Sequence, residues 1–236
     1  VFAVNMLIKV VVTFRYCKET RQGKIRMAET KDTSLLHMLY EYKELIPRVL
    51  KDKEVMKVLS VSVILYITNI VSTNFFSLYV TQWLGIESRY LAFFPILNAA
   101  VMLIFMIGIQ HKLELVKFRI PMWIGLALYA IAVILLILAP TGSIPFVIVY
   151  VFVVAVAGSL VMPRKDALIQ LNINAEERAR INALIMSFTI AFSSPFGYFA
   201  GWLSSIDRRL PFMFSFALFL VAIIIVGRIR DPEFSK

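Results

Sequence analysis

The chain has 236 residues, of which 60% are hydrophobic and only 17% are charged. A water-soluble domain of this length could not bury so many apolar side chains in one core. The formal net charge of +10 does not indicate nucleic-acid binding, because the basic side chains lie between long apolar stretches. The one cysteine, Cys17, excludes an internal disulfide.

Residues 1–14 form an apolar run. As a helix it would extend over about 21 Å, which is short of the roughly 30 Å hydrocarbon core of a bilayer. The run has no basic start and therefore does not indicate a signal peptide. We interpret it as the end of a truncated transmembrane helix and expect the chain to be part of a longer protein. Lys9 lies inside the run, with a stem long enough to carry its ammonium group to the membrane surface.

Residues 15–57 form a long, basic connection after this run. Apolar side chains recur in it at spacings of three and four, which predicts an amphipathic helix that Pro47 kinks or splits. The apolar side of this helix would carry Leu35, Leu39, Tyr42, Ile46 and Val49. Two placements are open: the helix bridges two halves of the protein, or it lies on the membrane surface.

Six apolar stretches follow, each with about 18 or more residues and no acidic or basic side chain, which is the length that a spanning helix needs. No alternation of polar and apolar residues indicates spanning strands. The spans are predicted at residues 58–84, 91–109, 120–139, 144–162, 181–203 and 210–227. The sequence therefore predicts an all-α integral membrane protein.

The basic side chains are divided unequally between the two sides of the predicted bundle. With six spans, the connection 15–57 and the tail 229–236 lie on the same side. That side carries 21 basic side chains and the other side carries three. Cytoplasmic connections are enriched in Lys and Arg. We therefore expect a multi-pass protein of the plasma membrane with loop 15–57 and the C-terminus in the cytoplasm, and with lipid rather than nucleic acid as its surroundings.

Polar side chains inside the spans are the candidate functional residues, because such groups are costly in hydrocarbon. In the 58–84 span, polar side chains recur at steps of three and four along one helix face, with a second strip beside it. The main candidates for a solute pathway are Tyr66, Asn69, Thr73 and Asn74, and the secondary ones are Asn98, Ser159, Ser187 and Ser193. The alternative is that these groups only form hydrogen bonds between helices.

The spans differ in polarity, and the difference predicts which of them face lipid. Spans 120–139 and 210–227 contain almost no polar side chain and are expected to face lipid, whereas spans 58–84 and 181–203 are expected to face protein or a water-filled cavity. Gly197 and Gly201 form a GxxxG pattern, which permits close approach by another helix.

No pattern indicates an enzyme, a metal site or a cofactor site. The two histidines have no HExxH spacing, no span holds an acidic cluster, and no phosphate-binding GxxxxGK[ST] motif occurs. Catalytic, metal-ligating and cofactor-binding residues are therefore not predicted. Two alternative classes are a membrane scaffold and the membrane domain of an ATP-driven transporter. The second usually has long helical loops in the cytoplasm, and the connection at 110–119 is too short to form one.

The order of elements resembles the second half of a major facilitator superfamily transporter: the end of a helix, a long basic loop and six spans. Residues 51–54 resemble the approach to the family's seventh helix, 163–168 and 177–184 resemble the connection from the tenth to the eleventh, and 194–203 resemble the eleventh. One departure is the loop after the 91–109 span, where the family's Gly-rich, Asp-Arg motif is degenerate.

This resemblance implies a six-helix half bundle over residues 58–228, made of two inverted three-helix repeats. The first helix of each repeat would line a central cavity. The second helices, including the one that carries Gly197 and Gly201, would pack on the N-terminal half of the same transporter, and the third would face lipid. The expected function is secondary active transport of a small solute by alternating access. Efflux of an amphipathic compound is slightly favoured, and uptake of a sugar or metabolite is the alternative.

Overall fold

The computed structural model describes residues 9–13, 15, 47, 51–110, 116–171 and 178–229. The chain divides into two compact units, residues 1–47 and 48–236. In the first unit, residues 9–13 are helical, and the Thr13 hydroxyl donates to the Lys9 carbonyl oxygen at 2.8 Å. The amphipathic helix predicted within the connection 15–57 lies outside the described residues, apart from Pro47.

The second unit consists of helices. They are α4 (Lys53–Leu78), the π-helical turn η1 (Tyr79–Trp83), the 3₁₀ helix η2 (Ser88–Ala92), α5 (Phe93–Gly108), α7 (Arg119–Ile137), α8 (Ile144–Leu171), α9 (Arg178–Ile206) and α10 (Leu210–Gly227). Six helices in the described part of the chain are long and apolar enough to cross a membrane, one for each predicted span. For the described residues, the prediction of an all-helical chain with six helices of membrane-spanning length and composition is confirmed.

Helices α4, α8 and α9 extend past the predicted spans, and the extensions of α4 and α8 are the longest. Helix α4 begins at Lys53 because Asp52 caps it: Asp52 Oδ1 accepts from the backbone N–H groups of Glu54 and Val55 at 2.9 and 3.2 Å. Helix α8 continues through Pro163 to Leu171 instead of stopping at residue 162. Hydropathy marks where a chain leaves hydrocarbon, whereas a charged helix can continue into water.

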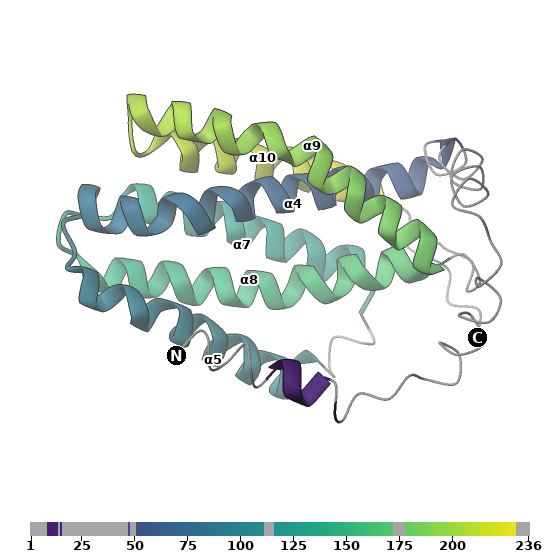
Figure 1. The fold of residues 1–236 in the computed structure, drawn as a ribbon, viewed down its shortest axis with the longest axis horizontal. Helices are drawn as coiled ribbons and strands as arrows, with labels where there is room; N and C mark the ends of the chain where they lie inside the picture. The colour runs from purple at the N-terminus through teal and green to yellow at the C-terminus, as the bar shows by residue number, and fades with distance from the viewer. Residues whose placement is uncertain are drawn as a thin grey trace. The chain divides into compact units, whose positions relative to one another are not determined.

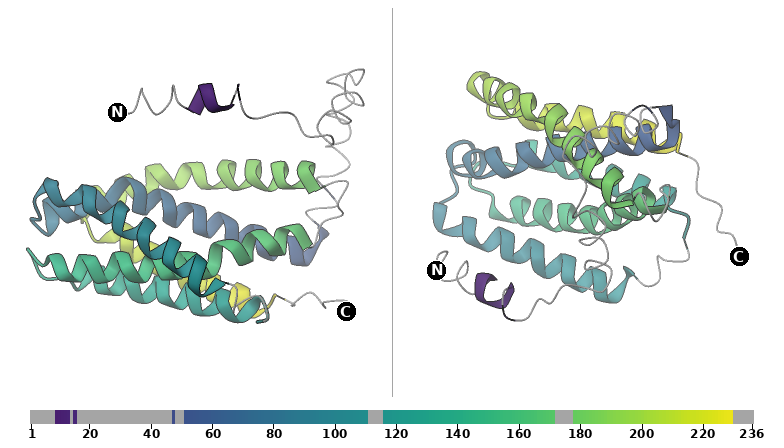
Figure 2. Two further views of the ribbon diagram at one scale, coloured as in Figure 1. Left: turned by 90° about the horizontal axis from the view of Figure 1, so that it is seen from below. Right: turned by 45° about the vertical axis from the view of Figure 1, so that its right-hand side comes forward.

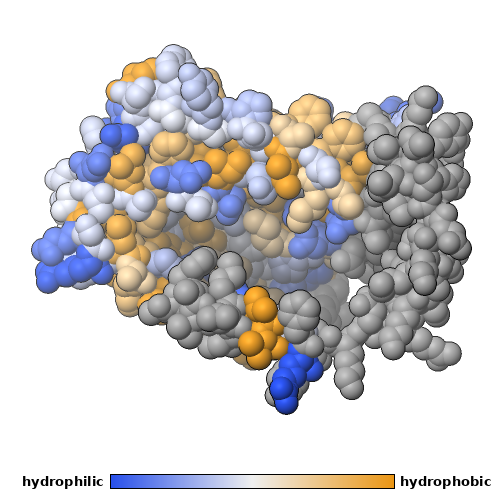
Figure 3. Space-filling view, viewed as in Figure 1, coloured by the Kyte–Doolittle hydropathy of each residue, from blue (hydrophilic) through white to orange (hydrophobic). Residues whose placement is uncertain are grey.

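The six spanning helices form two layers (Figure 1). Helices α9, α4, α8 and α5 lie side by side in the front layer, and α10 and α7 lie behind them; the turned views agree (Figure 2). Helix α8 packs on α5 and α7, α4 packs on α9 and α10, and α7 packs on α10. Helices α4 and α8 are therefore central, and α5 and α9 lie at the two edges. On the face shown in Figure 3, apolar side chains of the described residues are interspersed with side chains of intermediate and hydrophilic character.

Short-range contacts hold the helices together at the end of the bundle where α4 stops. The Tyr79 hydroxyl donates to the Leu136 carbonyl oxygen of α7 at 3.3 Å. The Arg209 guanidinium lies 4.5 Å from the centre of the Trp83 ring. The N–H of Gly142 donates to Leu84 O at 2.6 Å, and Gly142 has a positive φ of 77°, which favours glycine at this turn. These contacts join α4 to the α7–α8 and α9–α10 turns.

The opposite end of the bundle joins the start of α4 to the end of α10. The Lys57 ammonium contacts Glu54 Oε1 and donates to Arg228 O, both at 2.7 Å. On the neighbouring helices, Arg164 of α8 lies over the Phe118 ring at 5.4 Å. We call this end the Lys53 end, and the one described above the Trp83 end.

The coverage of the helices within this chain does not follow their polarity. Helix α4 is the most covered span, with 56% of its window buried. Helix α7, predicted to face lipid, is 44% buried, whereas α9, predicted to face protein or a cavity, is 22% buried. The difference arises because α7 packs on both α8 and α10 while α9 lies at an edge, and the assignment of the lipid-facing spans stays a prediction.

Candidate functional site

Three neighbouring cavities lie along α4 and α8. The central cavity, of about 80 Å³, lies between α4, α7, α8 and α10. The α5-side cavity, of about 510 Å³, lies between α4, α5 and α8. The α9-side cavity, of about 190 Å³, lies between α4, α8 and α9. Asn69 of α4 and Met162 of α8 belong to the walls of all three, so the cavities meet at these two residues.

Helical spacing places the polar side chains of α4 in these walls. Tyr66 lines the α9-side cavity, Asn69 lines all three, and Thr73 lines the α5-side cavity. Steps of three and four residues bring these side chains to one face of a helix. Asn69 and Thr73 are also exposed, so the helix presents amide and hydroxyl groups to open space instead of burying them against a neighbour.

The other predicted pathway residues occupy different positions. Asn98 of α5 lines the α5-side cavity. Asn74 and Ser187 are exposed and belong to none of the three walls. Ser159 is buried, and its hydroxyl donates to Ala155 O in its own helix at 2.9 Å. Ser193 is fully buried and also lies outside the three walls.

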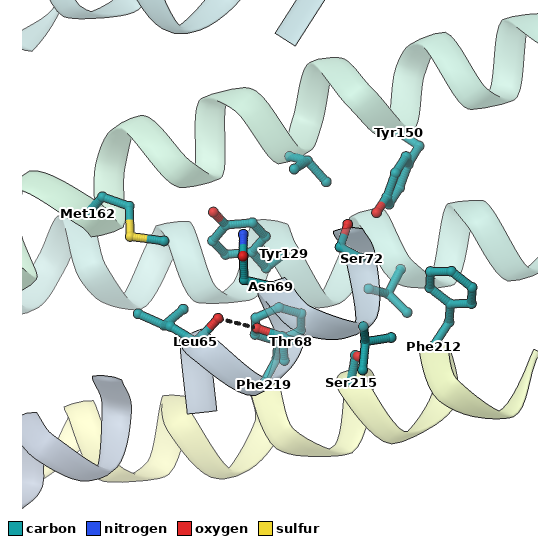
Figure 4. A pocket seen from close by; sticks show the side chains of 13 residues that line it. Leu65, Thr68, Asn69, Ser72, Tyr129, Tyr150, Met162, Phe212, Ser215 and Phe219 are labelled. Atoms are coloured by element: carbon teal, nitrogen blue, oxygen red, sulfur yellow. Dashed lines mark hydrogen bonds between the residues drawn. The ribbon is translucent and has the colours of Figure 1, made fainter. Parts of the chain in front are cut away.

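Two buried polar atoms in the cavity walls lack hydrogen-bond partners among the described residues. They are Asn98 Oδ1 in the α5-side cavity and Thr189 Oγ1 in the α9-side cavity. A buried acceptor or hydroxyl without a partner carries a free-energy penalty of about 1–3 kcal/mol. Water or a solute that entered the cavities could relieve it. By contrast, the Thr68 hydroxyl in the central cavity donates to Leu65 O at 3.0 Å (Figure 4).

Two tyrosines that the sequence did not single out enter the walls from α7 and α8. Tyr129 and Tyr150 both line the central and α5-side cavities. Tyr129 and Asn69 line the same two cavities, and Figure 4 shows the Tyr150 hydroxyl pointing toward Ser72. Tyr129 lies on an otherwise apolar span, so no sequence pattern marked it.

A glycine makes room for Tyr129. A β-carbon placed on Gly158 of α8 would lie 2.9 Å from Tyr129 Oη, closer than real β-carbons come. The Tyr129 ring is also stacked on Phe219 of α10, with centroids 5.0 Å apart and an interplanar angle of 1°. The position of the hydroxyl therefore depends on three helices together.

Aromatic rings form the apolar part of the α5-side cavity wall. Phe76 stacks on Tyr150 with a centroid distance of 5.4 Å and meets Phe94 edge-on at 5.8 Å. Met102 and Met162 line the same cavity, and flexible thioethers adapt to ligands of different shape. The cavity combines an apolar surface with a small number of hydrogen-bonding groups, as small-molecule sites do.

Charged side chains line only one of the three cavities among the described residues. The α9-side cavity includes Lys165 and Asp166, whose Nζ and Oδ1 atoms are 3.0 Å apart. These residues were predicted to lie in a connection, and no acidic side chain was expected in a span. Because α8 continues, Asp166 lies within the Ile144–Ile169 span at the Lys53 end. Among the described residues, no three His, Cys, Asp or Glu side chains form a group that could hold a metal ion.

The GxxxG pattern of α9 faces α4. A β-carbon on Gly197 would lie 3.7 Å from Ile70 Cγ2, and one on Gly201 would lie 4.0 Å from Phe75 Cζ. Both are ordinary van der Waals distances. These glycines therefore contact a helix of this chain, whereas the resemblance implied a contact with another half of the protein.

Comparison of the chain with protein-family models, with curated proteins and with solved structures finds no match.

Proposed function

We propose that this chain belongs to a secondary active transporter, in which α4 and α8 line the route of a small solute across the membrane. The observation that carries the proposal is the meeting of three cavities at Asn69 and Met162, in the central pair of helices. Together the walls extend from Asp166 near the Lys53 end to Ser77 near the Trp83 end. A scaffold would have no need of polar, unpartnered groups around such space.

The packing pattern supports alternating access between two repeats. The packing is similar in the two triplets if α4 corresponds to α8, α5 to α9 and α7 to α10. The α5–α8 contact then corresponds to the α9–α4 contact, and the α7–α8 contact corresponds to the α10–α4 contact. The α7–α10 and α4–α8 contacts map onto themselves. One departure is that α9 also packs on α10, while the corresponding contact between α5 and α7 is weaker. In the proposed cycle, these two triplets are the inverted repeats that the major facilitator resemblance implies.

A second six-helix half is part of the proposal. Helices α5 and α9 are the least covered spans, with 11% and 22% of their windows buried, and they flank the pair that lines the cavities. A second half that packed on these two edge helices would close the cavities toward lipid. The route would then run between the halves, with α4 and α8 as the contribution of this chain.

Cysteine substitution along α4 tests the pathway. In a Cys17→Ser background, Tyr66, Asn69 and Thr73 are each replaced by Cys, and the protein in membranes is treated from both sides with a water-soluble methanethiosulfonate. Because a thiol reacts as the thiolate, which forms in water, the three positions should be modified at least about tenfold faster than buried positions of the same helix.

The matched controls are Val61→Cys and Ile67→Cys, which replace side chains that are 0% and 3% exposed in α4. Equal rates at Asn69→Cys and Val61→Cys would remove the pathway and leave a packed membrane scaffold as the better interpretation.

A further inference from the structure

The walls of two cavities restrict the charge of a bound molecule. The central and α5-side cavities are lined, among the described residues, by apolar, aromatic, hydroxyl and amide side chains, with Lys165 and Asp166 confined to the α9-side cavity. An ion without a charged partner in such surroundings loses several kcal/mol of hydration free energy. These two cavities therefore favour an uncharged molecule.

The hydrogen-bonding groups in the same walls come mainly from α4, α5, α7 and α8. Asn69 and Ser72 of α4 face Tyr129 and Tyr150 (Figure 4), and Asn98 Oδ1 in the α5-side cavity has no partner among the described residues. An amide and a phenol each donate and accept, so together they match a hydroxyl or amide group of a ligand. Phe76 and Met102 in the α5-side cavity wall offer apolar contact.

Tyr129 is the member of this group whose position is the most specifically set. Its ring is held by the stack on Phe219, and its hydroxyl occupies the space that Gly158 leaves beside α8. A side chain at position 158 would displace the phenol, because the added β-carbon would lie 2.9 Å from Oη. The phenol hydroxyl therefore has a fixed place against Gly158, in the two cavity walls that it shares with Asn69.

We propose that the ligand of this site is an uncharged molecule with an aromatic or aliphatic body and a hydroxyl or amide group, and that Tyr129 is a specificity-determining residue. The polar group of the ligand lies between Asn69 and Tyr129, and its body lies against Phe76 and Tyr150 in the α5-side cavity. Gly158 acts as a positioning residue by admitting the phenol. This inference rests on the proposed function, since it names the substrate class of the same route.

Protection of one cysteine tests the charge preference. Thr73→Cys in the Cys17→Ser background is modified in membranes with the methanethiosulfonate in the presence of three probes of one shape: 1-naphthalenemethanol, which is neutral, 1-naphthalenemethylamine, a cation at pH 7, and 1-naphthoate, an anion. The neutral alcohol should slow the modification several-fold at concentrations at which the amine and the carboxylate leave the rate unchanged.

Three substitutions assign the protection to the named side chains. Asn69→Leu, of similar size, should abolish protection by the alcohol. Tyr129→Phe should weaken the alcohol's apparent affinity roughly 3- to 10-fold, the effect of one lost hydrogen bond. Gly158→Ala should weaken it similarly. The matched control is Tyr79→Phe, which removes a buried hydroxyl outside the cavity walls and should leave the affinity within about 1.5-fold, because no contact to the ligand is lost.

The outcomes separate this inference from the pathway itself. If Thr73→Cys does not react in the absence of a probe, the proposed function fails. If it reacts, and a charged probe protects as well as the alcohol or no probe protects, the uncharged-ligand site is wrong while the pathway stands. Equal effects of Tyr129→Phe and Tyr79→Phe would remove the specificity role of Tyr129. Since Gly158→Ala also changes helix packing, Tyr129→Phe decides this point.

Discussion

Helices α7 and α9 have opposite compositions and positions. Helix α7 is almost entirely aliphatic, yet it packs on two helices and supplies Tyr129 to two cavities. Helix α9 carries several hydroxyl side chains, yet it lies at an edge, and two of them, Ser187 and Ser193, line none of the three cavities. The polarity of a span therefore does not measure its closeness to the site.

The reason lies in the size of the polar side chains. A serine hydroxyl can bond the carbonyl oxygen of its own helix, as Ser62, Ser159 and Ser215 do with the residue four positions earlier. Such a bond satisfies the hydroxyl within its own helix, whether the residue lines a cavity, as Ser62 and Ser215 do, or does not, as with Ser159. A tyrosine holds its hydroxyl far from its own backbone. The Tyr129 side chain can therefore place a hydroxyl in a cavity wall although the rest of its helix is apolar.

The two helices are expected to differ most in the stability that is lost when a glycine is replaced by alanine. A β-carbon on Gly125 of α7 would lie 2.5 Å from Val161 Cγ2 and 3.0 Å from Ala157 O, whereas one on Gly197 of α9 would lie 3.7 Å from its nearest neighbour. Gly125→Ala should destabilise the protein by about 1–3 kcal/mol through overpacking, while Gly197→Ala should have little effect. Thermal unfolding of both purified variants in detergent measures this, and a larger loss for Gly197→Ala would contradict the packing described for α7.

The second-largest difference is expected in how readily water reaches side chains of α7 and α9. Tyr129→Cys places a thiol in a cavity wall and Ser187→Cys places one on the exposed face of α9 outside the three cavities. If that face meets lipid, a water-soluble thiol reagent should modify Tyr129→Cys on the order of tenfold faster, because the thiolate does not form in hydrocarbon. Faster modification of Ser187→Cys would instead place that face of α9 on the water-filled route.

The smallest difference is expected in the stability that is lost when a single hydroxyl is removed. Tyr79→Phe removes the hydrogen bond to Leu136 O of α7 and should cost about 0.6–1 kcal/mol, the usual range for such bonds in membranes. Ser193→Ala on α9 removes a buried hydroxyl that has no partner among the described residues, so it should be neutral or slightly stabilising. Denaturation midpoints of both variants measured side by side provide the test. A destabilising Ser193→Ala would reveal a partner for that hydroxyl.

Much of the fold could be predicted from the sequence, because bilayer thickness dictates the length of an uncharged helix. All six spans were found, and the spacing of Tyr66, Asn69 and Thr73 predicted one polar face on α4, whose members line the cavity walls. The continuation of α8 beyond Met162 was not predicted, because Pro163 and the charges after it were interpreted as the start of a connection.

The remaining wall residues could not be predicted, because tertiary packing alone brings them to the cavities. Met162 has no polar group, and Tyr150 lies in an apolar run. Tyr129 enters the wall only because the residue opposite it on α8 is Gly158. A glycine that accommodates the side chain of another helix leaves no periodic pattern in the chain, so pairs of this kind require coordinates.

The shared position of Asn69 also limits what that residue can control. In the proposed transport, a solute that passed between the α9-side and α5-side cavities would meet the same amide in both directions. A substitution of Asn69 is therefore expected to alter the rates of inward and outward movement together and not one of them alone.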